Sequence, residues 1–149
     1  MKNQKSRLAF TMIELVFIIV IIGILASVAI PRLAATRDDA EISKARVLVA
    51  SIRNALAMER QKRILRGEFT AITAVGGTTN VFGNFDDNSS QSEILEYPIA
   101  SSSNDAHWEF VSGGTYRYHG GPIGNVDFNI TSGKFVCDTS LTGCQQLTN

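Results

Sequence analysis

One acidic residue, Glu14, stands alone among the apolar residues of Phe10–Ile30. The stretch contains fourteen residues of Leu, Ile, Val and Phe, and it is about as long as a helix that crosses the hydrocarbon core of a bilayer. These residues favour insertion by about 4 to 8 kcal/mol, whereas a central carboxylate costs about 2.5 to 3.5 kcal/mol. The net free energy should therefore favour insertion. A carboxylate in lipid still costs free energy, so it should have a partner.

Few other residues have the types and spacing of a chemical site. Cys137 and Cys144 enclose six residues, and an export signal favours a disulfide between them over two free thiols. A zinc site needs more ligands, and His107 and His119 are too isolated in sequence to supply them. The sequence therefore predicts no metal site and no cofactor.

Two short segments invite other interpretations. The segment Asp86-Asp87-Asn88 could ligate calcium, but we expect an ordinary acidic turn. The same residues, followed by Ser89-Ser90, resemble the extended bacterial N-glycosylation sequon, as does Asp127–Thr131. Asn88 is thus a candidate for glycosylation, whereas Asn129 falls in a predicted strand and is the weaker candidate.

Enzyme motifs are missing from the sequence. Gly76-Gly77-Thr78-Thr79 lacks the lysine of a Walker A loop, and neither G-x-S-x-G nor H-E-x-x-H occurs. We therefore expect no enzymatic activity.

The charges are strongly segregated along the chain. The 149 residues have a net charge of zero. Residues 1–9 carry +3, residues 10–31 carry −1, residues 32–66 carry +5 and residues 67–149 carry −7. The aromatic residues Trp108, Tyr116 and Tyr118 could stack on DNA bases, but they lie in the acidic part, which repels phosphate. Nucleic acid is therefore not an expected partner, and these rings should belong to a sheet.

A helical pattern continues beyond the apolar stretch. Apolar residues recur at steps of three and four, which is typical of one face of a helix, and Gly67 follows the last periodic residue. We expect helix over residues 11–66, kinked at Pro31, which has no N–H to donate, with Gly23 as a second weak point. The apolar positions are Ile42, Ala45, Val49, Ile52 and Leu56, and the opposite side carries Lys44, Arg46, Arg53 and Arg60, expected to be solvated or to meet an acidic neighbour.

The remainder of the chain divides into two parts. Residues 67–106 are rich in Gly, Ser, Thr and Asn and are expected to form a long loop with one short strand near Phe69–Val75. Residues 107–149 alternate in polarity around Gly113-Gly114 and Ser132-Gly133, which predicts two hairpins and an antiparallel sheet of three or four strands. The predicted class is α+β, with the amphipathic half of the helix covering the sheet.

The residues Ala9-Phe10-Thr11-Met12-Ile13-Glu14-Leu15-Val16 resemble the prepilin leader and mature start of type IV pilins and type II secretion pseudopilins. The resemblance implies a pilin-like fold. It divides the chain into a basic leader (1–9), a transmembrane and assembly helix (10–31), an amphipathic helix (32–66), a variable loop (67–106) and a sheet with a C-terminal disulfide region (107–149).

The resemblance also implies roles for individual residues. A prepilin peptidase would cut between Ala9 and Phe10, although the family usually has glycine where Ala9 stands. Phe10 would become an N-methylated terminus. Glu14 would pair, inside the bilayer, with the terminal amine of a neighbouring subunit.

The implied function is that of a filament subunit, a pseudopilin or minor pilin of a type II secretion or related machine. Its partners would be other pilin-like subunits, the peptidase, an inner-membrane platform protein and an assembly ATPase. The chain would cross the bacterial inner membrane once, with its C-terminal part in the periplasm. Two alternatives stay open: a major type IV pilin for adhesion, motility or DNA uptake, and an exported enzyme or binding protein held by a signal anchor.

Overall fold

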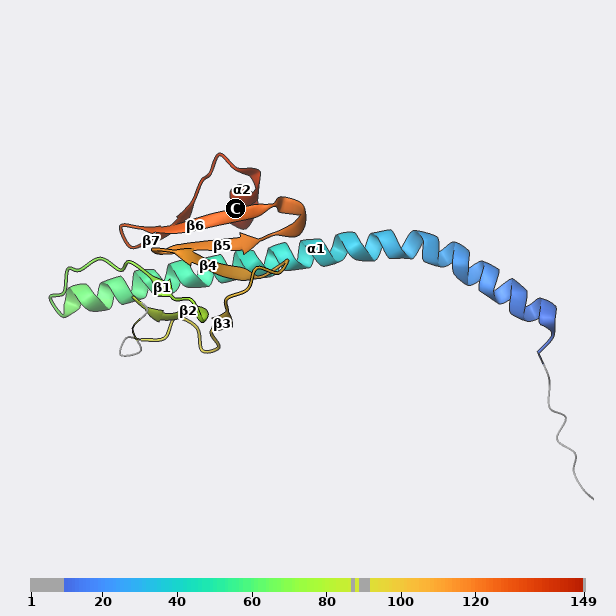
Figure 1. Cartoon of the computed structure of the whole chain (residues 1–149), viewed down its shortest axis with the longest axis horizontal. Coiled ribbons are helices and arrows are strands. Elements are labelled where there is room, and N and C mark those ends of the chain that lie inside the picture. The colour runs from blue at the N-terminus through green and yellow to red at the C-terminus, as the bar shows by residue number, and fades with distance from the viewer. Residues whose placement is uncertain (1–9, 87, 89–91, 149) are drawn as a thin grey trace, which may run out of the picture. The chain divides into compact units, whose positions relative to one another are not determined.

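The computed structural model describes residues 10–86, 88 and 92–148. The leader, including Ala9, lies outside the described residues, as do Asp87, Ser89 and Ser90. One long helix, α1 (Met12–Leu65), precedes all of the strands (Figure 1). The chain divides into two compact units, one ending at Arg37 and one comprising Asp38–Asn149, and each is described by itself.

The described helix agrees closely with the range expected from the sequence. At its end, Gly67 has a positive φ of 78°, its N–H donates to the carbonyl of Ile64, and the N–H of Glu68 donates to the carbonyl of Arg63. This pair of bonds is the Schellman motif, for which glycine is the favoured residue because it has no Cβ. Gly67 therefore ends the helix, as its position in the sequence predicts.

A four-stranded antiparallel sheet forms the larger part of the second unit. It comprises β4 (Trp108–Ser112), β5 (Thr115–His119), β6 (Asn125–Thr131) and β7 (Lys134–Cys137), in that order. A short 3-10 helix, η1 (Gly121–Ile123), joins β5 to β6. This arrangement confirms the antiparallel sheet predicted for residues 107–149.

Two-residue turns close both outer hairpins of this sheet. Gly113 and Gly114 join β4 to β5, and Ser132 and Gly133 join β6 to β7, and all four residues have positive φ. Such turns suit the twist of paired strands and favour glycine. At Gly114 even a methyl group would meet the carbonyl of Thr73.

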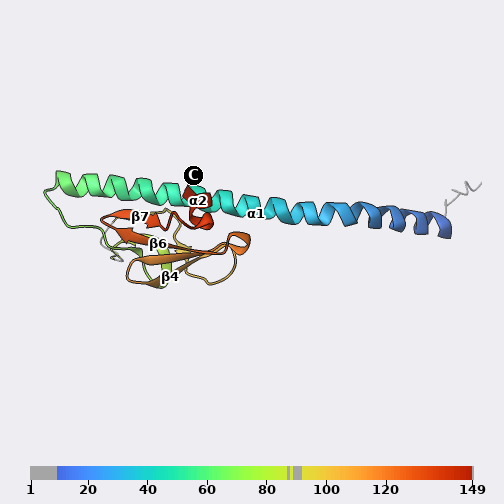
Figure 2. The same ribbon diagram turned by 90° about the horizontal axis from the view of Figure 1, so that it is seen from above.

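The amphipathic half of α1 covers the apolar face of this sheet. Figures 1 and 2 together show the strands on one side of this part of the helix. Ala45, Val49, Ile52 and Leu56 are buried in one core with sheet aromatics, among them Trp108, Tyr116, Tyr118, Phe128 and Phe135. The aromatic rings are therefore core residues, as expected, and are not available to stack on nucleic acid.

Residues 67–106 contain more regular structure than predicted. A second antiparallel sheet comprises β1 (Val75–Gly76), β2 (Asn80–Phe85) and β3 (Ile99–Ala100), in that order. The single strand expected near Phe69–Val75 is wrong in extent, since only its last residue lies in a strand. Val75, Val81, Phe82 and Phe85 are buried, so this segment extends the core.

The hydroxyl of Tyr116 links the two sheets. It accepts a hydrogen bond from the N–H of Val75 at 2.8 Å and donates to the carbonyl of Gly76 at 2.9 Å. The ring of Phe82 lies 5.0 Å from that of Trp108, between centroids and nearly edge-on. Both sheets therefore share one aromatic core.

The predicted disulfide links the C-terminal helix to the last strand of the four-stranded sheet. Cys137, at the end of β7, is bonded to Cys144 in the short helix α2 (Thr142–Thr148). Cys144 and Leu147 are fully buried. The pilin-like α+β arrangement, with a long N-terminal helix and small antiparallel sheets, is thus confirmed.

Candidate assembly site

The candidate site begins at the first turn of α1. Thr11 precedes the helix, and its hydroxyl oxygen accepts a hydrogen bond from the N–H of Glu14 at 3.3 Å. The T-x-x-E spacing is that of a capping box, in which a hydroxyl satisfies one of the free N–H groups of a helix start. A carboxylate in the first turn also suits the positive end of the helix dipole.

Apolar side chains surround Glu14 on α1. Within α1, one window of eighteen residues has a mean hydropathy of 3.0, and none of its residues is buried. Phe10 is 73% exposed and Leu33 is 69% exposed. By length and composition, this helix is able to cross a membrane.

Hydroxyl groups in this part of α1 are satisfied locally. Ser27 donates to the carbonyl of Ile24 at 2.7 Å, and Thr36 donates to the carbonyl of Leu33 at 3.0 Å. These bonds remove donors that lipid could not satisfy. Glu14 is the only acidic residue of the apolar stretch, and it is exposed.

The helix continues through both expected weak points. Gly23 and Pro31 lie inside α1, and proline cannot donate the hydrogen bond that position 31 would otherwise give to the carbonyl four residues earlier. The kinks remain predictions. The cleavage at Ala9–Phe10 and the methylation of Phe10 also remain predictions.

Lys44, Arg46 and Arg60 are exposed, as expected of a solvated face, and Arg53 is half-buried. Three of these basic residues also form bonds within the chain that the sequence did not predict. The guanidinium groups of Arg46, Arg53 and Arg60 donate to the carbonyls of Gln146, Phe135 and Ser132. They therefore fasten the helix to the C-terminal part of the same chain. The helical period alone could not show this, because the acceptors are backbone atoms 72 to 100 residues away.

A buried ionic cluster, which the sequence analysis did not identify, joins the end of α1 to the acidic segment. Arg63 and Glu59 are both buried, with a distance of 3.3 Å between Arg63 Nε and Glu59 Oε1. Arg63 also lies 2.8 Å from Asp86 Oδ2, and Asp86 accepts from the N–H of Thr73 at 2.7 Å. Desolvation raises the pKa of Asp86, but the hydrogen bonds from Thr73 and Arg63 outweigh it, so that the net pKa lies below the usual value.

This cluster supports the acidic-turn interpretation of the segment. Because Asp86 is engaged by Arg63 and Thr73, it is poorly placed to ligate calcium. Asp87 lies outside the described residues, so the acidic turn as a whole stays a prediction. Asn88 is exposed, and its glycosylation remains a prediction. Asn129, on β6, accepts a hydrogen bond from the Thr115 hydroxyl at 2.6 Å.

The two histidines are neighbours, since the N–H of His119 donates to the carbonyl of His107 at 3.0 Å, but their side chains contact different partners. His119 Nε2 is 2.8 Å from a carboxylate oxygen of Glu109, and His107 Nδ1 is 2.8 Å from the carbonyl of Asp105. Beside the first pair, Arg117 makes a bidentate bridge to Asp127, which lowers the pKa of that carboxyl. Arg117 and Asp127 are directly opposite each other on β5 and β6, and Glu109 and His119 form a diagonal pair across β4 and β5.

A comparison with known proteins agrees with this architecture. Part of the chain is similar to the type II secretion system core protein G of Vibrio cholerae serotype O1, with 36% identity over 58 residues. The resemblance to the pseudopilins is confirmed. The match covers 39% of this chain and 40% of the length of that relative. No family model and no solved structure matches the chain.

Proposed function

We propose that this chain is a filament-forming subunit, a pseudopilin or minor pilin, of a type II secretion or pilus-like machine. The observation that carries the proposal is an exposed apolar helix with a single carboxylate, Glu14, in its first turn. Relatedness to a type II secretion core protein favours secretion over a pilus for adhesion, motility or DNA uptake. The proposed role is structural and not enzymatic.

The exposed helix needs a covering that the described chain does not provide. Before assembly, the bilayer supplies it, with the C-terminal unit in the periplasm. After assembly, the same helices of other subunits supply it in the filament core. Helices gain little hydrophobic energy by associating within lipid, so a specific polar contact decides how they dock.

Glu14 would make this contact after processing. A prepilin peptidase would cut between Ala9 and Phe10 and expose an amine four residues before the carboxylate. The amine of one subunit and Glu14 of its neighbour would neutralise each other and set the axial register of the filament. A platform protein and an assembly ATPase would drive the movement.

Analysis of the mature N-terminus tests the proposal. The protein is recovered from native membranes and from sheared surface material, and its N-terminal peptide is identified by mass spectrometry. The expected peptide starts at N-methylated Phe10 and is absent from cells that lack the peptidase. A chain that stays intact from Met1, or that starts after Ala26 or Ala29, would contradict the proposal and support an anchored or secreted protein.

A further inference from the structure

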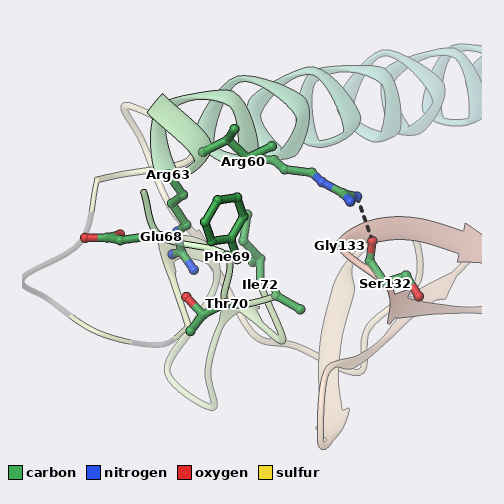
Figure 3. Close-up of a pocket in the computed structure, with 10 residues that line it drawn as sticks. Arg60, Arg63, Glu68, Phe69, Thr70, Ile72, Ser132 and Gly133 are labelled. Atoms are coloured by element: carbon green, nitrogen blue, oxygen red, sulfur yellow. Dashed lines mark hydrogen bonds between the residues drawn. The ribbon is translucent and has the colours of Figure 1, made fainter. Parts of the chain in front are cut away.

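An open groove with a basic rim runs along the end of α1 beside the β6–β7 turn. Two adjoining hollows of about 230 and 410 Å³ form it, and Arg60 and Gly133 line both. Figure 3 shows its first part, where Phe69 lies below the helix end and Arg60 reaches the turn at Ser132. We call it the basic groove and define it by Ala57, Arg60, Ile64, Phe69, Lys134 and Val136.

Basic side chains outnumber acidic ones along the groove: Glu68 lines the first hollow together with Arg60 and Arg63, and Arg53, Arg60 and Lys134 line the second. Among the residues that the structure describes, no carboxylate forms an ion pair with Arg53, Arg60 or Lys134. Arg53 and Arg60 instead donate to backbone carbonyls of Phe135 and Ser132. Those bonds hold both guanidinium groups beside β7, whose other side is not paired with a strand.

Apolar side chains lie exposed between these charges. Phe69 is 83% exposed, Ile64 is 48% exposed and Val136 is 38% exposed. An exposed apolar patch with a charged rim is typical of a protein interaction site. The occupant should therefore carry acidic groups around an apolar or aromatic side chain.

The chain itself presents such a segment between β2 and β3. Glu93, Glu96 and Tyr97 are exposed, and Tyr97 is 79% exposed. The backbone of this segment is held in place, because the N–H of Ile94 donates to the carbonyl of Gly83 at 2.7 Å and Glu93 forms a bridge with Asn84. In the described part of the chain neither Glu93 nor Glu96 has an ion pair.

The groove and the acidic segment belong to different edges of the folded unit. The groove follows β7, the last strand of the four-stranded sheet, whereas the acidic segment leads into β3, the last strand of the other sheet. In Figure 1, β7 is drawn above α1 and β3 is drawn below it. A contact between two different surfaces is heterologous and can repeat along an open assembly.

We propose that the basic groove of one subunit binds the segment Glu93–Tyr97 of the next copy. Tyr97 packs against Ile64 and Phe69, and the two glutamates face Arg60 and Lys134. This contact would add specificity outside the membrane to the docking of the apolar helices. The inference rests on the proposed filament, but its test separates the two.

Charge exchange in the full-length protein gives the first test. Lys134→Glu and Glu96→Lys should each lower the yield of sheared filaments about tenfold, because each places like charges in contact. The double variant should restore the yield to within about twofold of wild type. Lys44→Glu and Asp105→Lys are matched controls at exposed positions outside both surfaces and should assemble normally. A double variant no better than either single variant would overturn the pairing.

Photo-crosslinking gives a second, independent readout. Tyr97 is replaced by p-benzoylphenylalanine, cells are irradiated, and crosslinked peptides are mapped by mass spectrometry. The expected product joins position 97 to residues 57–69 or 132–136 of another copy, while the same probe at Leu141 gives no such product. Filaments whose crosslinks from position 97 map elsewhere on the chain, or to a different protein, would overturn this contact and leave the filament proposal standing. Absence of both filaments and processing at Phe10 would overturn the filament proposal itself.

Discussion

Leu33 and Leu56 belong to the same helix, yet Leu33 is 69% exposed and Leu56 is 1% exposed. The difference extends to their surroundings. Every described residue up to Arg37 is exposed or half-buried, whereas the unit Asp38–Asn149 contains a complete aromatic and aliphatic core. The second unit buries its apolar core within itself, whereas the apolar surface of the first is not covered by the described chain. The packing that folds the second unit is thus separate from the surface through which the helices of the proposed filament would associate.

The largest expected effect on filament assembly separates association from folding. Glu14→Ala should reduce filament yield by about a hundredfold, equivalent to about 2.7 kcal/mol, because the terminal amine of the neighbour loses its partner. Membrane insertion and the folded second unit should be unchanged. Yields are measured by shearing and immunoblotting, with Asp105→Ala as the control at an exposed acidic position. Normal filaments from Glu14→Ala would show that the two units are not divided in this way.

Within the second unit, Arg63→Met should be the most destabilising change. It removes the nearest partner of the buried Glu59, which among the described residues keeps only Lys62 at 3.8 Å, and breaking a buried pair typically costs about 3 to 5 kcal/mol. Unfolding of the full-length protein in detergent micelles is followed by the fluorescence of Trp108, the only tryptophan and a buried one. Arg66→Met, at an exposed position, is the control. Equal stabilities of the two variants would contradict the role of the cluster.

Substitutions of Leu33 and Leu56 directly test the difference between the two units. Leu56→Ala should lower the free energy of unfolding of the second unit by about 2 to 5 kcal/mol, because it leaves a cavity in the core. Leu33→Ala should change that free energy by less than about 0.5 kcal/mol. Both are measured by denaturant titration in the same micelles. Similar losses for both variants would show that residues before Asp38 also stabilise the folded unit.

The disulfide should have a smaller effect. Cys137→Ser with Cys144→Ser removes a short covalent loop and should cost about 2 kcal/mol. The double replacement avoids a lone thiol, and the wild-type protein treated with a reductant serves as the parallel sample. Stability unchanged by both treatments would mean that burial of Leu147 and the bonds of Arg46 alone hold the C-terminus.

The smallest expected effect is the pH dependence of the stability that Asp86 contributes. The pKa of Asp86 is lowered in the folded state, so its stabilisation is present above the unfolded pKa of about 3.9 and is lost as pH falls through the lower folded value. Asp86→Asn should be less stable than wild type at pH 7, and the difference should shrink below about pH 4. Denaturant titrations at several pH values measure it. A difference independent of pH would contradict this ionic contribution.

Periodicity predicted the regular elements well. The steps from Ile42 to Leu56 define the buried face of α1, and alternation around two glycine-containing turns defines both hairpins. The sheet of residues 75–100 was missed because two of its strands have only two residues each. In β2, three consecutive residues from Val81 are buried, and Phe82 has a φ of 58°, so the strand lacks the alternation by which strands are recognised.

Long-range polar contacts were beyond sequence reasoning for a different reason. The strands β1 and β2 separate Arg63 from Asp86 in the chain. Asp86 lies in a segment whose sequence suggests calcium binding or glycosylation, but nothing in that segment points to Arg63. Glu14 could be singled out because a carboxylate is anomalous in an apolar stretch wherever the chain folds. An anomaly is visible locally, whereas a well-matched pair becomes visible only after the fold brings it together.

The order of elements has a consequence for biosynthesis. The helix face from Ala45 to Leu56 is synthesised first, but its core partners include Cys144 and Leu147, and Arg46 bonds to the carbonyl of Gln146, 100 residues later. Loops of this length close slowly, and uncovered apolar surface invites aggregation in the meantime. Until β7 and α2 have been synthesised, the face from Ala45 to Leu56 therefore stays partly uncovered, and a chaperone bound to it would limit aggregation.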